Sequence, residues 1–419
     1  MTRLVVPRIA LLAAIQLATA RAETAAFGPP PGADLKLEKL EAIESFVNGE
    51  VAAGRIPGAI VLIQQHGKRV YFKCFGKRDV DAGTPMTEDA IFPIHSVTKT
   101  ITSVAAMMLV DRGTIALDDP VSKYIPSFAG MKVGVERKDE SGKTVLDPVA
   151  LRRPITIEDL MLHTSGITYG FYGVGLVKAA YGGIYLGDFD NAGFVERIAK
   201  VPLAEQPRTL WDYGHSMDVL GRVIEVASGQ SLYQFEKQNL FDPLGMTTTK
   251  FFLTDPVERA RYAQPLAKDR HVERNSLNVT RWESGGGGMV STVADFARYG
   301  AMLLNGGTLD GRTYLSPATF KAMTTDHIGP GAGVARNFYY YPGDGFGYGY
   351  GFGIRTDPGN ASPPAPGSLG EIKWDGATGV YLVVDRAEDM FFVVMQDSPS
   401  GRMHVITTIK KIIYDALEK

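Results

Sequence analysis

The sequence has only one cysteine, Cys74, among its 419 residues. A single thiol cannot form an internal disulfide or build a thiolate metal cluster. The seven histidines include no HExxH or HxxxH pair. We therefore expect no metal site, and nothing in the sequence calls for a bound cofactor.

An excess of charge of one sign is also missing. The 44 Lys and Arg residues are balanced by 46 Asp and Glu residues, for a formal net charge of −2. Without a basic surplus to follow a phosphate backbone, nucleic acid is not an expected partner. No later apolar run reaches the roughly 20 residues that a membrane helix needs, so we expect no membrane span in the mature chain.

The N-terminus has the features of a secretory signal. Arg3 and Arg8 give a positive start, Ile9–Ala18 is apolar apart from one glutamine, and Ala18-Thr19-Ala20 or Ala20-Arg21-Ala22 offers a cleavage site between small residues. The alternative, a membrane anchor, needs a much longer apolar run. We expect cleavage and a secreted or periplasmic protein.

Strand-like segments lie at both ends of the chain, and helix-like segments lie between them. Residue types and spacing predict strands over Ala59–Gln65, Arg69–Phe75, Ile372–Trp374, Val380–Val384 and Phe391–Gln396. Apolar periodicity predicts helices over Leu35–Ala53, Ser96–Val110, Ile157–His163, Phe194–Ala199, Ser216–Ala227, Tyr233–Leu240 and His404–Leu417. The simplest architecture is one sheet assembled from both ends of the chain, covered by the terminal helices, with a helical domain inserted.

This pattern divides the chain into three parts. Residues 1–22 are the expected signal peptide, 23–117 together with 285–419 the sheet domain, and 118–284 the mainly helical domain. The alternating aromatics of Phe346–Ile354 read as one further strand, whose glycines allow close backbone approach. Ligands favour clefts at domain junctions, so the site is expected between the two domains.

The most informative short string is His95-Ser96-Val97-Thr98-Lys99, which precedes the apolar run Ile101–Val110. A serine in the first turn of a helix lies near the positive end of the helix dipole, and a lysine three residues later shares its face. Such a lysine can take the serine proton when burial lowers its pKa. The plain alternative is a helix cap followed by a solvated lysine. A lysine ahead of an almost wholly apolar helix is, however, costly without a task.

Two further strings carry candidate site residues. Trp211-Asp212-Tyr213-Gly214-His215-Ser216 enters a predicted helix, and Lys373-Trp374-Asp375-Gly376-Ala377 ends a predicted strand before small residues. At the second string a backbone N–H can face a neighbouring site, as an oxyanion hole requires. Taken alone, each string also fits ordinary packing, as a core aromatic with a serine cap or as a glycine-rich turn.

Together and in this order, the three strings resemble the serine β-lactamase and penicillin-binding-protein superfamily, most closely class C β-lactamases and family VIII carboxylesterases. The resemblance runs from about Leu37 to Ala416 and implies an α+β fold, with an antiparallel sheet flanked by terminal helices and an inserted helical domain. Supporting strings typical of that family are Leu162-His163-Thr164-Ser165-Gly166-Ile167, Leu220-Gly221-Arg222-Val223-Ile224-Glu225, Asp242-Pro243-Leu244-Gly245-Met246 and Gly286-Gly287-Gly288-Met289-Val290-Ser291-Thr292.

The resemblance also implies roles. Ser96 and Lys99 match the nucleophile and the lysine of the Ser-x-x-Lys motif, and Tyr213 matches the tyrosine of Tyr-x-Asn. The backbone N–H groups of Ser96 and Ala377 would form the oxyanion hole. Ser96 would attack an ester carbonyl, Lys99 and Tyr213 would share the proton transfers as a coupled pair, and water would hydrolyse the acyl-enzyme. Which of the two is the base stays open.

Departures from the lactamase pattern bear on the substrate. His215 stands where the lactamase asparagine contacts the substrate amide, and Trp374 stands where a lysine helps to hold the substrate carboxylate. An indole offers an apolar wall to a neutral group instead. Asp375, followed by the turn residue Gly376, departs from both the Lys-Thr-Gly and Trp-Gly-Gly patterns, and strand alternation turns its side chain away from the face of Trp374. We therefore expect a carboxylesterase for neutral esters with short to medium acyl chains.

Other interpretations remain open. A β-lactamase or D-alanyl-D-alanine peptidase uses the same catalytic parts, and weak cephalosporin hydrolysis is compatible with an esterase of this family. A non-catalytic ligand-binding relative is the alternative from another functional class. An α/β-hydrolase is disfavoured because the chain has no Gly-x-Ser-x-Gly string. The stretch Asn337–Phe352, with Phe171 and Tyr172, either lines the acyl pocket or packs as sheet core. The natural substrate and the oligomeric state are not predicted.

Overall fold

The computed structural model describes residues 35–270 and 276–417. The expected signal peptide, residues 1–22, lies outside the described residues, so its prediction stands as one from sequence alone. In the described part of the chain, no helix combines the length and the apolar character needed to cross a membrane.

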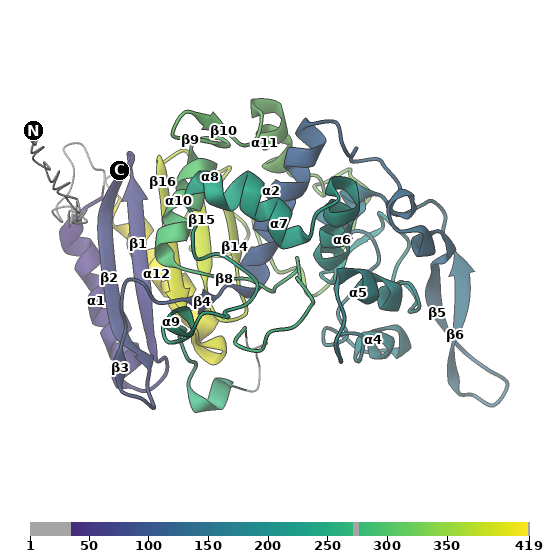
Figure 1. Cartoon of the computed structure of the whole chain (residues 1–419), viewed down its shortest axis with the longest axis horizontal. Helices are drawn as coiled ribbons and strands as arrows, with labels where there is room; N and C mark the ends of the chain where they lie inside the picture. Colours follow the sequence, from purple (N-terminus) through teal and green to yellow (C-terminus); the bar gives the residue numbers. More distant parts are fainter. Residues whose placement is uncertain (1–34, 271–275, 418–419) are drawn as a thin grey trace, which may run out of the picture.

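The centre of the fold is an antiparallel sheet that joins the two ends of the chain (Figure 1). In the described residues it has eight strands in the order β12-β13-β14-β15-β16-β1-β2-β3. β1 lies between β2 and β16, with Val61 opposite Val394 in the register of the second pair. The strands are β1 (Gly58–Gln65), β2 (Lys68–Asp79), β3 (Thr84–Pro85), β12 (Phe346–Tyr348), β13 (Gly353–Arg355), β14 (Ile372–Asp375), β15 (Tyr381–Asp385) and β16 (Met390–Gln396). The α+β fold predicted from sequence is confirmed.

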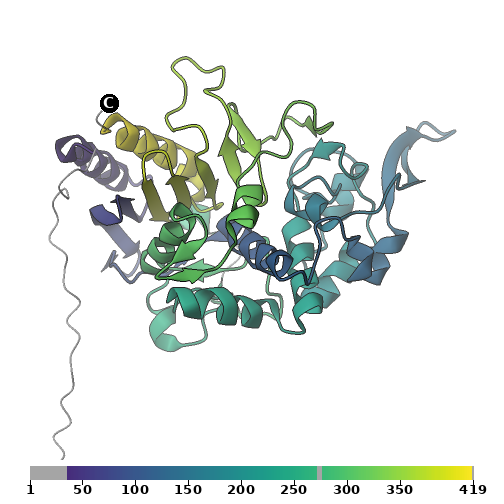
Figure 2. The same cartoon turned by 90° about the horizontal axis from the view of Figure 1, so that it is seen from above.

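Each face of the sheet buries its own core, because successive strand residues point to opposite sides. The terminal helices α1 (Leu37–Ala52) and α12 (Arg402–Asp415) lie side by side on one face (Figure 2). Val61 belongs to the core beneath them, whereas the next residue, Leu62, belongs to the core beneath α2 (Thr98–Asp111) and α10 (Val293–Leu304). The sheet is thus a layer between two sets of helices.

The part of the chain between the two halves of the sheet is mainly helical, and Figure 1 shows its helices α4, α5 and α6, whose bounds follow, on the side of α2 that faces away from the sheet. Its segments include α3 (Ile157–Met161), α4 (Leu176–Tyr181), α5 (Asn191–Ile198), α6 (Ser216–Ser228), α7 (Leu232–Glu236) and α8 (Asp242–Leu244), with a π-helical turn over Lys237–Phe241 between the last two. A short helix α9 (Pro256–Arg259) follows, and α11 (Pro317–Met323) comes after α10. The domain boundaries proposed above stay predictions.

Short strand pairs and 3₁₀ turns complete the described elements. The pairs are β4 (Phe92–Pro93) with β8 (Val290–Ser291), β7 (Leu210–Trp211) with β11 (Ala335–Arg336), and β9 (Thr308–Leu309) with β10 (Arg312–Thr313). The 3₁₀ turns are His95–Val97, Val121–Lys123, Pro126–Gly130, Ala267–Asp269 and Pro399–Gly401. β4 lies just before the first of these turns, and β8 lies just after the glycine-rich stretch Gly285–Gly288. Their pairing therefore connects two segments that reach the site.

Two of the differences between the structure and the sequence expectation concern strands. A hairpin of β5 (Lys132–Lys138) and β6 (Thr144–Ala150) extends from the helical part, where no strand was expected. Its strands are largely polar and exposed, so they lack the buried face that makes a strand recognisable. The stretch Phe346–Ile354 forms two strands, β12 and β13, rather than one, because the chain turns back around Gly351, where φ is +88°.

Candidate active site

Ser96 lies in the 3₁₀ turn that leads directly into α2. The preceding residue, His95, has a φ of +42°, a conformation that non-glycine residues seldom adopt. Ser96 is partly exposed, whereas α2 is buried from Thr98 to Leu109. The backbone N–H of Ile94 donates to the carbonyl of Met289 at 3.0 Å, which ties this turn to the end of the glycine-rich stretch. Ser96 is therefore accessible to solvent just before the N-terminus of α2, whereas most of that helix is buried.

Lys99 is completely buried one turn after Ser96. Its Nζ lies 3.3 Å from Ser96 Oγ and 3.1 Å from the hydroxyl of Tyr169, and it donates a third hydrogen bond to the carbonyl oxygen of Gly286. All three partners are uncharged groups. Burial lowers the pKa of Lys99 to about 7, against the opposing attraction of the Asp218 carboxylate. The lysine can therefore lose its proton near neutral pH.

Tyr213 lies against the same lysine, with Lys99 Nζ 4.6 Å from the centre of its ring. Burial raises the pKa of Tyr213, and the nearby side chains of Ser96 and Trp374 only partly oppose the rise. Burial therefore keeps the phenol of Tyr213 protonated. The structure does place the Tyr213 side chain beside both Ser96 and Lys99.

The sequence analysis missed Tyr169, whose hydroxyl is hydrogen-bonded to Lys99. Its ring makes edge contacts with Tyr213 and His215, with centroids 5.6 and 4.4 Å apart. Tyr169 follows the string Leu162–Ile167 by two residues, but an aromatic there fits core packing equally well. Only the fold reveals that it reaches the lysine.

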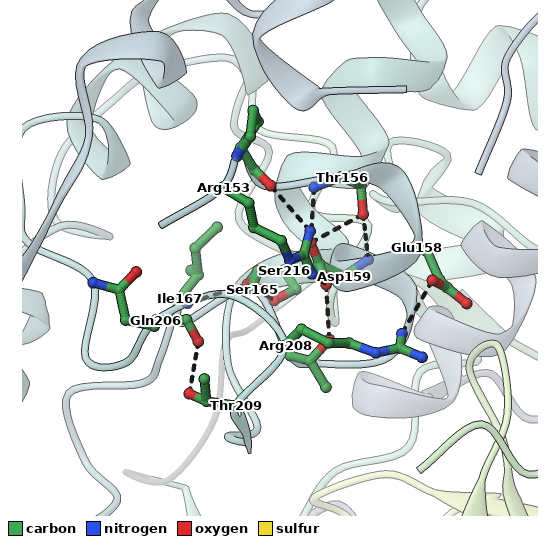
Figure 3. Close-up of polar contacts among 12 residues, drawn as sticks. Arg153, Thr156, Glu158, Asp159, Ser165, Ile167, Gln206, Arg208, Thr209 and Ser216 are labelled. Atoms are coloured by element: carbon green, nitrogen blue, oxygen red, sulfur yellow. Dashed lines mark hydrogen bonds and ion pairs between the residues drawn. The ribbon is translucent and has the colours of Figure 1, made fainter. Parts of the chain in front are cut away.

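The string Leu162–Ile167 holds the start of α6 in place. Asp159 accepts hydrogen bonds from the backbone N–H and the hydroxyl of Thr156, both 2.9 Å long (Figure 3). It also accepts one from the hydroxyl of Thr164 at 3.2 Å. The next residue, Ser165, shares a hydrogen bond of 2.9 Å with Ser216, the first residue of α6. The polar network therefore links α3 to the segment that carries Tyr213 and His215.

Close backbone packing fixes the same segment from its other side. A Cβ added at Gly214 would lie 2.4 Å from the carbonyl oxygen of Ile167, so only glycine fits there. The backbone N–H of Asp212 donates to the carbonyl of His163 at 2.9 Å. The His163 ring packs 4.7 Å from that of Tyr213, and burial keeps its pKa well below the usual range. Neutral His163 thus serves as packing beside Tyr213.

The His215 side chain is held by a buried carboxylate. Its Nδ1 lies 2.9 Å from Asp218 Oδ2, and both side chains are buried. The ring also packs against Phe194, with centroids 5.2 Å apart. The structure therefore places the predicted substrate-binding residue His215 behind Tyr169, paired with a carboxylate that the sequence analysis did not single out.

Trp374 and Asp375 point to opposite faces of β14, as strand alternation predicts. Trp374 pairs in register with Leu382, which belongs to the core beneath α2, while Asp375 pairs with Tyr381 beneath α12. Asp375 forms an ion pair of 2.6 Å with Arg402, the first residue of α12. The charge of Asp375 is thus balanced.

The turn after β14 packs against the residues that precede Ser96. A Cβ added at Gly376 would lie 2.3 Å from the carbonyl oxygen of Ile94 and 3.4 Å from His95 Cβ, so glycine lets the two segments touch. The backbone N–H of Gly376 donates to the carbonyl of Val380 at 2.8 Å and closes the turn. Ala377 follows, partly exposed. The predicted oxyanion-hole residues Ser96 and Ala377 therefore lie on adjoining segments.

Comparison with known proteins identifies the family and the fold. The Beta-lactamase family matches residues 43–410. Esterase EstB of Burkholderia gladioli is 30% identical over 393 residues, which cover 87% of this chain and 92% of EstB. Protein Rv1367c of Mycobacterium tuberculosis is 35% identical over 360 residues, which cover 82% of this chain and 86% of that protein.

Solved structures share the fold. The structure titled EstCE1, a hydrolase with promiscuous acyltransferase activity, superimposes with a TM-score of 0.73 at 25% identity, covering 90% of this chain and 99% of that one. A class C β-lactamase has a TM-score of 0.67 at 17% identity, a likeness of fold alone, covering 94% of this chain and 99% of that one. These findings define the class of protein, a serine hydrolase of the superfamily that contains β-lactamases and esterases. Within that superfamily the chain belongs to the β-lactamase family.

Proposed function

We propose that this protein is a carboxylesterase that cleaves neutral carboxylic esters with short to medium acyl chains through an acyl-enzyme on Ser96. The observation that carries the proposal is the position of Lys99. Its Nζ is buried 3.3 Å from Ser96 Oγ among uncharged partners, and its pKa is lowered to about 7. A neutral amine in that place has a lone pair free to accept the serine proton.

In the proposed first step, Ser96 Oγ bonds to the ester carbonyl carbon while its proton passes to Lys99 Nζ. The backbone N–H groups of Ser96 and Ala377 stabilise the oxyanion that forms. The C–O bond to the alcohol then breaks, and the alkoxide takes up a proton delivered by the Lys99 and Tyr213 pair. In the second step, water attacks the acyl-enzyme, gives its proton to the same pair and releases the acid and Ser96.

The surroundings of Trp374 support a neutral substrate. The indole is 1% exposed and packs against Tyr213, Tyr341 and Tyr348, with centroids 5.7, 5.5 and 5.4 Å apart. Such an aromatic wall suits an apolar acyl or alcohol group. Tyr341 lies in the stretch Asn337–Phe352, so this stretch contributes both sheet core and a wall beside Tyr213.

The outer rim of this wall is apolar as well. Phe171 is 60% exposed and stacks on Tyr169 at 4.7 Å, and Phe338 is 88% exposed beside Gly173. Tyr172 stacks on Tyr339 at 3.7 Å between them. In the proposed function, these side chains contact the part of the ester that extends beyond Trp374.

A β-lactamase or D-alanyl-D-alanine peptidase is the competing function, since it would use the same serine and lysine. Its anionic substrate needs a cation beside the pocket, and Arg402 lies 5.2 Å from the ring of Tyr341, which packs on Trp374. Because Arg402 is already paired with Asp375 at 2.6 Å, its charge is not free for a substrate carboxylate. This pairing favours esters and leaves β-lactam hydrolysis as a weak side activity.

Acyl transfer to an alcohol is a second candidate activity. EstCE1 is described as a hydrolase with promiscuous acyltransferase activity. In this chain the apolar wall around Trp374 favours an alcohol over water as the group that enters next to the acyl-enzyme. Adding an alcohol to the esterase assay and measuring the new ester tests this activity.

The test of the proposed function compares p-nitrophenyl acetate, butyrate and octanoate with a chromogenic cephalosporin. We expect ester turnover to exceed cephalosporin turnover, to peak at acetate or butyrate and to vanish in Ser96→Ala. Ser103→Ala is the matched control: it makes the same change at a buried position inside α2, where the Ser103 hydroxyl is hydrogen-bonded to Met217 Sδ at 3.7 Å. Turnover retained in Ser96→Ala would refute the proposal, and dominant cephalosporin turnover would replace it with the lactamase function.

Two further measurements address the remaining alternatives. A fluorophosphonate probe should label Ser96, identified by mass spectrometry, and a protein that never labels there would be a non-catalytic binding relative.

We also propose export to the periplasm or the medium. N-terminal sequencing of the exported protein should begin after Ala20 or Ala22, and an uncleaved chain in the cytoplasm would contradict this localisation.

A further inference from the structure

The carboxylate of Asp218 joins the start of α6 to the glycine-rich segment beside Lys99. Asp218 lies in the first turn of α6 and is 3% exposed. Its Oδ2 lies 2.9 Å from Nδ1 of His215, and its Oδ1 accepts hydrogen bonds from the hydroxyl of Ser284 at 2.6 Å and from the backbone N–H of Gly286 at 3.1 Å. Both oxygens are therefore engaged.

The same peptide segment that donates to Asp218 accepts from the lysine. The N–H of Gly286 points to Asp218, and its carbonyl oxygen takes a hydrogen bond from Lys99 Nζ. Asp218 thus reaches Lys99 through a single residue. If the glycine-rich segment moved away from α6, the lysine would lose its carbonyl partner.

Two glycines allow the glycine-rich segment to pack closely against α6. A Cβ added at Gly286 would lie 2.6 Å from Asp218 Oδ2, and one added at Gly285 would lie 2.8 Å from the carbonyl oxygen of Met217. Both glycines therefore let the loop lie directly against α6. The hydroxyl of Thr102, on α2, donates to the carbonyl of Gly285 at 2.9 Å and holds the loop from the other side.

We propose that Asp218 is a positioning residue for the esterase reaction: it fixes the Gly286 carbonyl that orients Lys99 toward Ser96, and it holds His215 against Tyr169. The inference rests on the proposed function, in which Lys99 accepts the serine proton. Asp218 does not touch the reacting atoms. Its effect passes through Gly286 and through its negative charge.

The charge of Asp218 acts within a defined set of ionisable neighbours. Burial raises the pKa of Asp218, but hydrogen bonds from His215 and Ser284 together with the Lys99 cation outweigh it, so that its pKa is below the usual range. The other ionisable groups that face Lys99 are Tyr169, Tyr213 and His163, and α7 adds Glu236 near Thr102. Burial disfavours charge on all four. Asp218 is thus the anion that favours the charged form of Lys99.

Asp218→Asn tests the proposal. Its amide oxygen keeps an acceptor for Ser284 or Gly286, while the negative charge is lost. We expect kcat/KM to fall about tenfold or more, mainly through kcat. We also expect the limb of the pH profile that reports Lys99 to move to lower pH, since the ammonium form is less favoured without the anion. The rate of Ser96 labelling by a fluorophosphonate should fall and shift in parallel.

Asp295→Asn is the matched control. Asp295 is equally buried and accepts from the backbone N–H groups of Thr248 and Thr249 and from the Thr249 hydroxyl, with no contact to Lys99. It should lower the melting temperature and leave the pH profile unchanged. If Asp218→Asn behaves in the same way, with normal kcat/KM per labelled serine, Asp218 is purely structural and the proposal is overturned.

Two provisions keep the outcome clear. If Asp218→Asn does not fold, Ser284→Ala decides: a fall of about threefold or more in kcat/KM supports the proposal, and wild-type rates refute it. Ser96→Ala is measured alongside. If Ser96→Ala is inactive and Asp218→Asn has wild-type kinetics, only the positioning role fails, whereas activity retained in Ser96→Ala overturns the esterase mechanism itself.

Discussion

Two buried lysines, one on each side of the sheet, differ in what surrounds them. Lys99, on α2, has the partners Ser96, Tyr169 and the carbonyl of Gly286, none of them charged. Lys410, on α12, is 6% exposed and donates to the carboxylate of Glu371, which is fully buried. Burial lowers the pKa of both, but Glu371 opposes the shift directly at Lys410. The adjacent carboxylate gives Lys410 a structural ion pair, whereas Lys99, without one, is the reactive lysine of the proposed function.

Removing the reactive lysine gives the largest expected effect. Lys99→Met should lower esterase kcat/KM by about a thousandfold or more, since proton transfer by a placed base contributes about 10²- to 10⁴-fold. Stability should not fall. A lysine whose folded pKa is below its unfolded value destabilises the fold fully below about pH 7 and less as pH rises toward 10.5. Kinetics and thermal unfolding at pH 6 check both statements; activity within tenfold of wild type would break the comparison.

Removing the structural lysine should have the reverse signature. Lys410→Met leaves Glu371 buried without its cation, although the Tyr414 hydroxyl still donates to it at 3.0 Å. Breaking such a pair costs about 3 kcal/mol of unfolding free energy. Esterase kcat/KM, measured well below the melting temperature, should stay within about twofold of wild type.

The double variant Lys410→Met with Glu371→Gln provides the control. It removes both charges, so most of the lost stability should return. Urea unfolding of the three proteins measures the difference. A double variant no more stable than Lys410→Met alone would show that packing around Lys410, rather than charge pairing, sets its contribution.

The pH profile tests the reactive lysine without mutation. If neutral Lys99 is the base, kcat/KM rises with pH as the ammonium loses its proton and levels off above its pKa of about 7. Between pH 5 and pH 7 the neutral fraction increases about 50-fold, and the rate should follow it. Fluorophosphonate labelling of Ser96 should share the profile. A flat profile from pH 5 to 8 would place the base elsewhere.

Short sequence motifs predicted the candidate catalytic residues better than the residues that hold them in position. Ser96 and Lys99 could be found from sequence because a polar pair at the start of an apolar helix contradicts the surrounding pattern. Tyr213 and the turn at Gly376 followed from the resemblance. Asp218 could not be found, because an aspartate in the first turn of a helix is ordinary. Its role depends on Gly286, which is 68 residues away in the chain.

The fold shows the same division. Sequence patterns predicted the strands that are buried on both faces, such as Val380–Val384, to within one residue of β15. They did not predict β5 and β6, whose exposed residues carry no apolar period. They also did not divide Phe346–Ile354 into two strands, since alternation continues through the turn and gives no sign of where the chain reverses.

The smallest expected effect concerns a buried carboxyl group that has no ion-pair partner among the described residues. Glu236 is fully buried, and burial raises its pKa well above the usual range. A carboxyl group with a raised folded pKa stabilises most below its unfolded value of about 4.5, and stability is lost as pH rises toward the folded pKa. Glu236→Gln removes this pH-dependent loss of stability. The variant should therefore become more stable relative to wild type between pH 5 and pH 9, while its esterase activity stays unchanged. Thermal unfolding of both proteins at pH 5 and pH 9 measures the difference. If Glu236→Gln and wild type differed by the same amount at both pH values, Glu236 would already be ionised at pH 5. Burial without an ion partner would then not be enough to keep a carboxyl group neutral in this fold.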